Sequence, residues 1–534
     1  MRWIRYQRSR WQSWAIMRLK VWVWVWACVV LICANPVQAA PRFAPVVVPD
    51  HIYSGGWEHF VGGGLAAFDC DGDHLPELYA AGGSAPAMLL RNRAQVGGDV
   101  VLKAATPASL ALTGVIGAYP LDIDSDGILD LAVLRVGQNL LLRGGLDCGF
   151  TRFEGLHFTS GNRWTTAFSA TWEAGQTLPT LAFGNYVDRD NPKGPFRACD
   201  INLLYRPDGP TYGEPMPLTP GHCPLSMLFS DWGRSGRADL RLSNDRHYYV
   251  DQGQEQLWAM GHPPRLFDET DGWQVHKLWG MGIAARDLDG DGQQEVMLSS
   301  MGDQRLQVLD PGKGPHYDDV PFDRGTTAQR PYLGGDGRPS TGWHVAFGDV
   351  QNDGRDDIFI AKGNVEQMPD SAMDDPNNLL VQGVDGRFSE GGAGAGIASP
   401  HRGRGAALVD LNGDGLLDLA LVNRRAPLEV WQNVTAEPGQ WLAVSLSQPA
   451  PNRGAVGGWI ELDAGGARQL REITVGGGHA GGSAGAQHFG LGKAGQVRMR
   501  VIWPDGFVSG WVDPGVNGYV ALHRADDGLR VIPY

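Results

Sequence analysis

The fold of this 534-residue chain is decided by a stretch that reads GMGIAARDLDGDGQQEVMLSS over residues 280–300. Three aspartates stand at alternate positions in its centre, and a glutamate follows them. Short apolar runs bounded by glycine flank this acidic loop on both sides, which is typical of β-strands. The stretch therefore predicts a strand, an acidic loop and a second strand.

The acidic loop recurs through the middle of the chain at intervals of 53, 109, 56, 62 and 61 residues. Because the long interval is about twice the others, we expect a seventh copy without acids near Trp172, where the flank recurs as LPTLAFGNYV. Such a period is typical of propellers. With four strands per copy, it predicts an all-β chain built on a seven-bladed β-propeller. The acidic copies read DCDGDHLPEL from residue 69, DIDSDGILDL from 122, DWGRSGRADL from 231, DLDGDGQQEV from 287, DVQNDGRDDI from 349 and DLNGDGLLDL from 410.

The acid spacing indicates a hard cation. Side-chain oxygens at loop positions 1, 3, 5 and 9, with the position-7 carbonyl, would surround calcium, whereas magnesium demands stricter geometry and zinc or copper favour other ligands. An EF-hand would need its glutamate at position 12, where these loops carry apolar residues. The predicted ligands are Asp69, Asp71, Asp73, Glu77, Asp122, Asp124, Asp126, Asp130, Asp287, Asp289, Asp291, Glu295, Asp349, Gln351, Asp353, Asp357, Asp410, Asn412, Asp414 and Asp418.

The copies differ in quality, and we name each loop by its first residue. Gln351 and Asn412 replace an aspartate at position 3 but still offer an oxygen. The Asp231 loop has only two carboxylates in register, Asp231 and Asp239, so it is expected to be weak or empty. The copy near Trp172 should bind nothing. About five calcium sites are therefore predicted.

These loops resemble the FG-GAP/VCBS repeats of integrin α-subunit propellers. The sequence of residues 279–300 is similar to that of the cartilage acidic protein family, whose members typically add a C-terminal ASPIC/UnbV domain. The sequence motifs of that domain are also present in this chain, in the same order. They read NRGAVGGWIEL from residue 452, QLREITVGGGHAGG from 469, QHFGLG from 487 and VIWPDG from 501.

The residues themselves predict the same second domain. From about Gln440 the chain alternates apolar and polar residues between Gly and Pro turns, which indicates a small all-β, sandwich-like domain. We expect a propeller over residues 40–434 and this domain over residues 435–534.

The N-terminus predicts export. Six basic residues precede an apolar run at residues 21–34, which is shorter than the roughly 20 residues of a membrane span. Residues 1–39 are therefore read as a signal peptide, with an uncleaved anchor as the alternative, and a secreted or periplasmic protein follows. Of the four cysteines beyond it, Cys199 and Cys223 are expected to pair, with Cys70 and Cys148 either paired or free.

Charge and motifs limit the function. A net charge of -14, which becomes -20 once the six basic residues of the first 39 positions are set aside, argues against nucleic acid as a partner. No catalytic residues are assigned, because the GxSxG at residues 481–485 lacks the strand and helix of a nucleophile elbow. A ligand site is expected where strand starts converge on the propeller axis, at His59, Trp279, His344, His401 and Arg402.

Two functions remain open from the sequence. The favoured one is an exported calcium-binding propeller that serves as a non-catalytic binding or adhesion platform for a protein or glycan. The alternative is an extracellular enzyme or accessory factor acting on a substrate at the axial mouth, since a propeller fold does not exclude catalysis. No membrane span is expected after signal cleavage.

Overall fold

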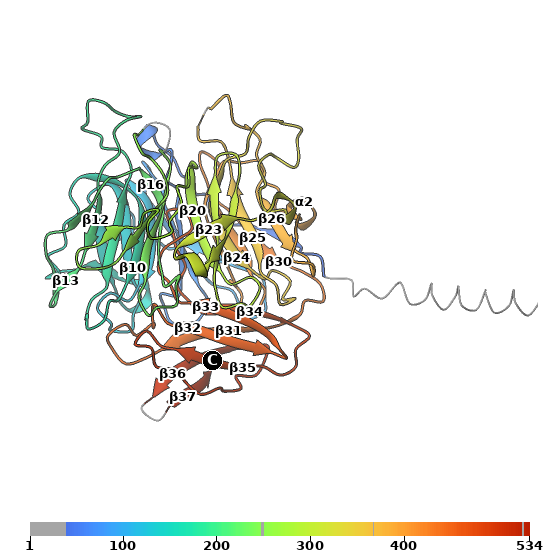
Figure 1. Cartoon of the computed structure of the whole chain (residues 1–534). Coiled ribbons are helices and arrows are strands. Elements are labelled where there is room, and N and C mark those ends of the chain that lie inside the picture. The colour runs from blue at the N-terminus through green and yellow to red at the C-terminus, as the bar shows by residue number, and fades with distance from the viewer. Residues whose placement is uncertain (1–38, 247–249, 367, 526–527) are drawn as a thin grey trace, which may run out of the picture. The chain divides into compact units, whose positions relative to one another are not determined.

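The computed structural model describes residues 39–246, 250–366, 368–525 and 528–534 (Figure 1). The predicted signal peptide lies outside the described residues except for Ala39. Residues 40–534 form one compact unit. The all-β prediction is confirmed, because helical turns are short and few among the described elements: η1 (Trp57–His59), η2 (Leu146–Cys148), η3 (Pro311–Lys313), η4 (Phe322–Arg324) and α2 (Gly392–Ala395).

Seven antiparallel hairpins repeat along the chain, and each has its acidic loop, or the decayed copy, as the turn. In every hairpin the residue before loop position 1 pairs with loop position 9, as Arg286 does with Glu295 and Thr171 with Thr180. The seventh copy near Trp172 is therefore confirmed as a strand pair. The hairpins are β2 (Leu65–Phe68) with β3 (Glu77–Ala80), β6 (Val115–Leu121) with β7 (Asp130–Gly137), β10 (Arg163–Thr171) with β11 (Thr180–Asn185), β16 (Pro224–Ser230) with β17 (Asp239–Asn244), β20 (Gly280–Arg286) with β21 (Glu295–Ser300), β24 (Gly342–Gly348) with β25 (Asp357–Lys362), and β28 (Gly403–Val409) with β29 (Asp418–Asn423).

Two further strands extend each hairpin to four strands. The last set takes its fourth strand from the other end of the chain, because β1 pairs with β30. A short pairing of β7 with β10 joins two of the sets into one eight-stranded sheet, and β13 (Pro207–Asp208) with β14 (Thr211–Tyr212) forms a separate small ribbon. The outer strands are β4 (Met88–Asn92), β5 (Leu102–Ala104), β8 (Leu140–Gly144), β9 (Phe150–Arg152), β12 (Asn202–Tyr205), β15 (Met216–Leu218), β18 (Gln256–Ala259), β19 (Arg265–Leu266), β22 (Arg305–Asp310), β23 (His316–Asp319), β26 (Asn378–Gln382), β27 (Phe388–Glu390), β30 (Glu429–Asn433) and β1 (Phe43–Val46).

The first strands of the hairpins contact one another in chain order. β2 contacts β6, and the series continues through β10, β16, β20, β24 and β28, which contacts β2 again. Hydrophobic clusters lie between neighbouring sheets. Met297 of β21, for example, packs with Val345 of β24. Burying both faces of a sheet against its neighbours is how a propeller-like arrangement makes a core from short strands.

The C-terminal strands form two further sheets, drawn in orange and red in Figure 1. One has the order β34-β31-β36-β37, and the other has the order β33-β32-β35. A single cluster that includes Leu442, Ile460 and Trp503 contains side chains of both sheets, as in a sandwich. These strands are β31 (Gln440–Ser447), β32 (Trp459–Ala464), β33 (Ala467–Glu472), β34 (Gln487–Gly492), β35 (Arg498–Ile502), β36 (Tyr519–Ala525) and β37 (Gly528–Pro533).

Residues 475–484, which we call the glycine segment, leave this domain and run among the first strands of the hairpins. The segment exchanges backbone hydrogen bonds with them: Gly477 N donates to Met227 O at 2.7 Å and Gly478 N to Ile283 O at 2.7 Å. Its bridges are Val475 to Ala170 of β10, Gly476 to Leu228 of β16, Gly478 to Ile283 of β20, Gly481 to Ala118 of β6, and Ser483 to Ala67 of β2.

Only glycine fits at several of these contacts. A Cβ on Gly481 would lie 2.2 Å from Leu65 O, and one on Gly478 would lie 2.5 Å from the His344 ring. The fit is reciprocal, because a Cβ on Gly117 would lie 1.5 Å from Ala480 O. The glycine run therefore fills the space among the first strands by close backbone approach.

Two disulfides cross-link the hairpin sheets. The predicted Cys199–Cys223 pair is confirmed, and Cys70 pairs with Cys148. Within the described ranges, no helix has the length and apolarity that a membrane crossing requires.

Candidate metal centres

The acidic loops share one backbone template, which the position-1 aspartate organises. In the Asp287 loop, the Asp287 carboxylate accepts hydrogen bonds from Gly290 N at 2.7 Å and Gly292 N at 3.1 Å. In the Asp122 loop, Asp122 accepts from Asp126 N at 3.1 Å and Gly127 N at 3.0 Å. Holding these amides bends each loop so that the oxygens of later positions turn toward position 1.

The closing acid at position 9 is buried where the second strand begins. Glu295 accepts from Leu288 N at 2.8 Å, and Asp130 accepts from Ile123 N at 2.7 Å and Gly144 N at 2.8 Å. These bonds tie the end of the loop to its start and to the next strand. The closing carboxyl group is thereby fixed beneath the loop.

Three loops bring carboxylates together at metal-ligand distances. Their oxygens lie within 4.8 Å of one another in three sets, which are Asp69, Asp71 and Glu77; Asp122, Asp124 and Asp130; and Asp287, Asp289 and Asp291.

The position-3 oxygens are the sharpest test of whether these loops fit a cation. Asp71 Oδ1, Asp124 Oδ1 and Gln351 Oε1 are buried, and no donor from the described part of the chain reaches them. A buried oxygen without a donor costs about 1 to 3 kcal/mol. A bound hard cation would remove that cost at three loops simultaneously, so the residues present fit calcium.

Electrostatics point the same way. Burial, followed by neighbouring loop aspartates, raises the pKa of Asp130 and of Glu295 to about 8, although backbone hydrogen bonds lower it. Burial likewise raises the pKa of Glu77 to about 7 and that of Asp122 to about 6. Carboxylates held near one another in this way need a positive charge to remain ionised.

The first two loops are partly neutralised by arginine. Arg91 pairs with Asp71, and Arg143 Nε lies 2.8 Å from Asp124. Among the described ion pairs, none involves Asp287, Asp289 or Asp291. Of the three clusters, the Asp287 loop is thus the one without an arginine ion pair among the described residues.

The C-terminal domain contacts two further loops. Tyr519 donates its hydroxyl to Asp410 at 2.7 Å, and a Cβ on Gly490 would lie 1.8 Å from Asp349 Oδ2. In these loops the position-3 amides donate to the position-5 carboxylates: Gln351 to Asp353 at 2.9 Å and Asn412 to Asp414 at 3.0 Å.

In the two poor copies, protein groups satisfy the ligand positions. In the Asp231 loop, Asp239 accepts from Trp232 Nε1 at 3.0 Å and Met260 N at 2.9 Å. In the copy at Trp172, the Thr180 hydroxyl donates to Glu173 at 2.8 Å. Neither arrangement resembles the carboxylate clusters above.

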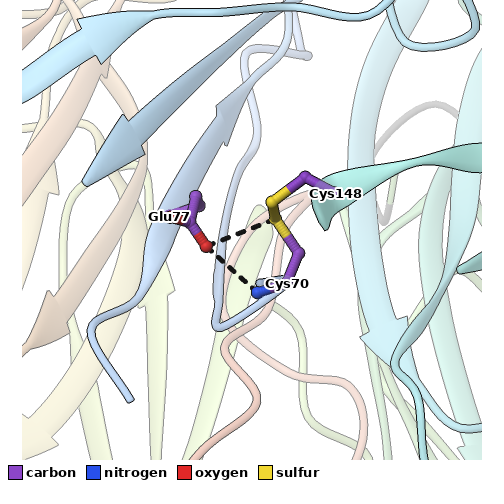
Figure 2. Close-up of side chains that lie close together, drawn as sticks. All are labelled: Cys70, Glu77 and Cys148. Atoms are coloured by element: carbon purple, nitrogen blue, oxygen red, sulfur yellow. Dashed lines mark hydrogen bonds between the residues drawn. A yellow bond between two sulfur atoms is a disulfide. The ribbon is translucent and has the colours of Figure 1, made fainter. Parts of the chain in front are cut away.

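The first loop is also cross-linked. Figure 2 shows that Glu77 lies beside the Cys70–Cys148 disulfide, and Cys70 N donates to Glu77 Oε2 at 3.0 Å. Asp147, next to Cys148, accepts from Arg91, which also pairs with Asp71. The first loop is therefore joined to the next blade-like sheet covalently, by the disulfide, and electrostatically, by the ion pairs of Arg91 with Asp71 and Asp147.

The structure does not bring the five predicted axial residues into one site. His344 accepts a hydrogen bond from His479 N of the glycine segment at 3.1 Å, and His401 is exposed. Arg402 offers its carbonyl to Arg424 N at 2.8 Å, and His59 lies in η1. Of the five, Trp279 lines a cavity at the strand ends opposite the acidic loops. Sequence reasoning missed most residues of that cavity, including Glu366 and Arg424.

Together these features define an all-β, propeller-like protein with clustered acidic loops and a small C-terminal β domain. Residues 448–528 match the family described as ASPIC and UnbV. The chain is 27% identical to mouse cartilage acidic protein 1 over 234 residues and 29% identical to the Xenopus tropicalis protein over 239 residues. The predicted resemblance is confirmed: this chain carries an ASPIC/UnbV domain and is a relative of cartilage acidic protein 1.

The similarity is partial. Each alignment covers 42% of this chain and 34% of the mouse or frog protein, so the match spans about a third of those relatives. Among solved structures, BBS1N in complex with ARL6DN aligns with a TM-score of 0.43 at 11% identity, covering 73% of this chain and 97% of that chain. An Agrocybe aegerita protein that recognises non-reducing terminal N-acetylglucosamine aligns with a TM-score of 0.38 at 12% identity, covering 70% and 94%.

Proposed function

We propose that this protein is an exported, calcium-binding, seven-bladed β-propeller that acts as a non-catalytic platform for a protein or glycan partner. The cycle of contacts from β2 through β28 and back to β2 supports seven blades. The pairing of β1 with β30 supports closure of the last blade by the N-terminal strand. The two disulfides, together with the apolar N-terminal stretch, support export to an oxidising compartment.

The carrying observation for calcium is the set of donor-free, buried position-3 oxygens in three loops of one repeated register, two of which also hold clustered carboxylates. Bound calcium would supply the positive charge that the loops lack. Positions 1, 3, 5 and 9 of the Asp69, Asp122 and Asp287 loops would hold it, with the amide-containing Asp349 and Asp410 loops as further sites. Its role is structural: it keeps each hairpin turn closed and leaves the sheet surfaces rigid for a partner.

Isothermal titration of the chelator-treated protein with calcium tests the cation, and the same titration with magnesium is the control. We expect calcium to bind several sites, with magnesium much weaker because it dehydrates reluctantly and demands octahedral geometry. For the platform, capture of partners from the exported fraction should succeed in calcium and fail in chelator. Equal capture under both conditions would contradict a calcium-dependent platform.

A further inference from the structure

A cavity of about 520 Å³ lies at the hairpin ends opposite the acidic loops. Its position follows from chain order, because its lining residues precede or begin first strands or follow second strands, whereas the loops join the other ends. The lining is mainly apolar and aromatic. Two rings at the rim, Trp57 and Phe196, are 47% and 56% exposed. The cavity is also lined by Trp279, Met281, Met301 and Trp343.

The glycine segment supports one wall of this cavity. The His479 ring packs edge-on against Trp343 at 5.0 Å, and the Arg404 guanidinium lies 3.9 Å from the centre of the same ring. Trp343 is fully buried, and its Nε1 donates to Gly363 O at 2.7 Å. The wall is therefore rigid and preformed, as small-molecule pockets usually are.

Arginines outnumber acids around the cavity. Among its lining residues, Glu366 is shared by two guanidiniums: Arg424 at 2.6 Å and Arg425 at 2.5 Å. The other lining acid, Asp245, accepts from the buried Tyr186 hydroxyl and lies 3.4 Å from Arg246. Three lining arginines thus face two carboxylates that are already engaged.

A fourth arginine lies behind the lining. Arg404 is fully buried and donates to backbone carbonyls, which are those of Phe60, Gly403, Asn364 and Val365. No ion pair joins it to a carboxylate within the described ranges. Burial, followed by the nearby Arg424 charge, lowers the pKa of Arg404 well below its usual value. A positive region therefore adjoins an apolar cavity in a protein whose net charge is -14.

We propose that this cavity binds a small organic anion, with an apolar, ring-sized body among the aromatic side chains and a carboxylate against the arginines. A guanidinium fork matches a carboxylate, and the cavity removes water from the contact. A neutral sugar fits less well, because the lining is mainly apolar and aromatic and a sugar brings no charge to the arginines. This inference does not depend on calcium in the loops, which lie at the other hairpin ends.

The test uses naphthalene-2-carboxylate as the probe and naphthalene-2-methanol as its neutral match, titrated calorimetrically into the whole calcium-containing protein. We expect one molecule of naphthalene-2-carboxylate to bind per chain. The Kd of the alcohol should be at least tenfold higher, which corresponds to about 1.4 kcal/mol of binding free energy. Arg425→Gln, at a half-exposed side chain, should weaken the carboxylate about tenfold and leave the alcohol unchanged. Phe196→Ala should weaken both probes.

The control is Arg152→Gln, at an exposed arginine of β9 outside the cavity lining. It should change neither affinity, and melting curves should show that all three variants remain folded. No binding of the carboxylate, equal binding of acid and alcohol, or equal effects of Arg425→Gln and Arg152→Gln would each overturn the proposal. If N-acetylglucosamine binds and naphthalene-2-carboxylate does not, the cavity is a sugar site and the proposal is wrong.

Discussion

The Asp231 and Asp287 loops turn neighbouring hairpins with the same register, yet they differ in chemistry. Ser230 pairs with Asp239 in one and Arg286 with Glu295 in the other. The Asp287 loop carries aspartates at positions 3 and 5, whereas the Asp231 loop has Gly233 and Ser235 there. The hairpin register is thus the same with and without aspartates at positions 3 and 5, and under the proposed function these two side chains decide whether the loop holds a cation.

The Asp231 loop, which lacks the aspartates at positions 3 and 5, contacts the C-terminal domain. Its Asp231 N donates to Glu472 at 2.8 Å, and Arg234 lies over the Trp459 ring at 4.0 Å. The Asp287 loop keeps its aspartates clustered without a basic partner among the described ion pairs. The Asp287 loop also packs against that domain, because a Cβ on Gly290 would lie 2.8 Å from Arg468 O. Both loops therefore contact the domain, and the clustered aspartates distinguish the loop that is suited to a metal.

The largest effect should come from removing all calcium. A site occupied at one hundred times its Kd contributes about 2.7 kcal/mol, so several sites together shift Tm by on the order of 10 °C. Scanning calorimetry of the same sample in calcium and in EGTA measures this shift. Identical melting curves would show that the loops hold no stabilising cation.

A smaller loss should follow from converting the good loop into the poor one. Asp289→Gly with Asp291→Ser gives the Asp287 loop the position-3 and position-5 residues of the Asp231 loop. We expect Tm in calcium to fall by a few degrees, about one site's share, while Tm in EGTA changes less. A fall in Tm of equal size in calcium and in EGTA would show that the two aspartates stabilise the turn without binding a cation.

The reverse exchange should add a site. Gly233→Asp with Ser235→Asp supplies the missing oxygens, and a Cβ at Gly233 meets no atom within 4 Å. We expect calcium to raise the Tm of this variant by about a degree or two more than that of the parent. An unchanged calcium response would mean that the nearby arginines or Glu472 exclude a cation there.

Much of the acidic end could be predicted from sequence because its pattern repeats. Ligand spacing, strand boundaries and the seventh copy all follow from one period. The opposite end does not repeat: Trp57, Arg246, Glu366 and Arg424 come from different hairpins and share no spacing. The position of the glycine segment could not be predicted either, because glycine residues produce no hydrophobic periodicity. The segment packs against Leu65 and His344, which lie in strands distant in the sequence.

The smallest effect concerns pH in the absence of calcium. Asp130, Glu295 and Glu77 have folded pKa values of about 8, 8 and 7, above those of an unfolded chain. The folded state then binds more protons, so the stability that these groups contribute is complete below about pH 4, where unfolded carboxyls titrate, and is lost as pH rises to about 8. With calcium bound, this fall should disappear, because the cation replaces the protons. Thermal melts in EGTA and in calcium across this range measure the difference.

The most direct measurement is the number of calcium ions bound per chain at equilibrium, determined by mass spectrometry of dialysed protein. The parent should bind about five, since five loops offer oxygens at all four ligand positions. Asp289→Gly with Asp291→Ser should bind one fewer, while Ser235→Ala in the Asp231 loop should match the parent. A parent protein free of calcium, or equal counts in the parent and the double variant, would contradict the assignment of these loops as calcium sites.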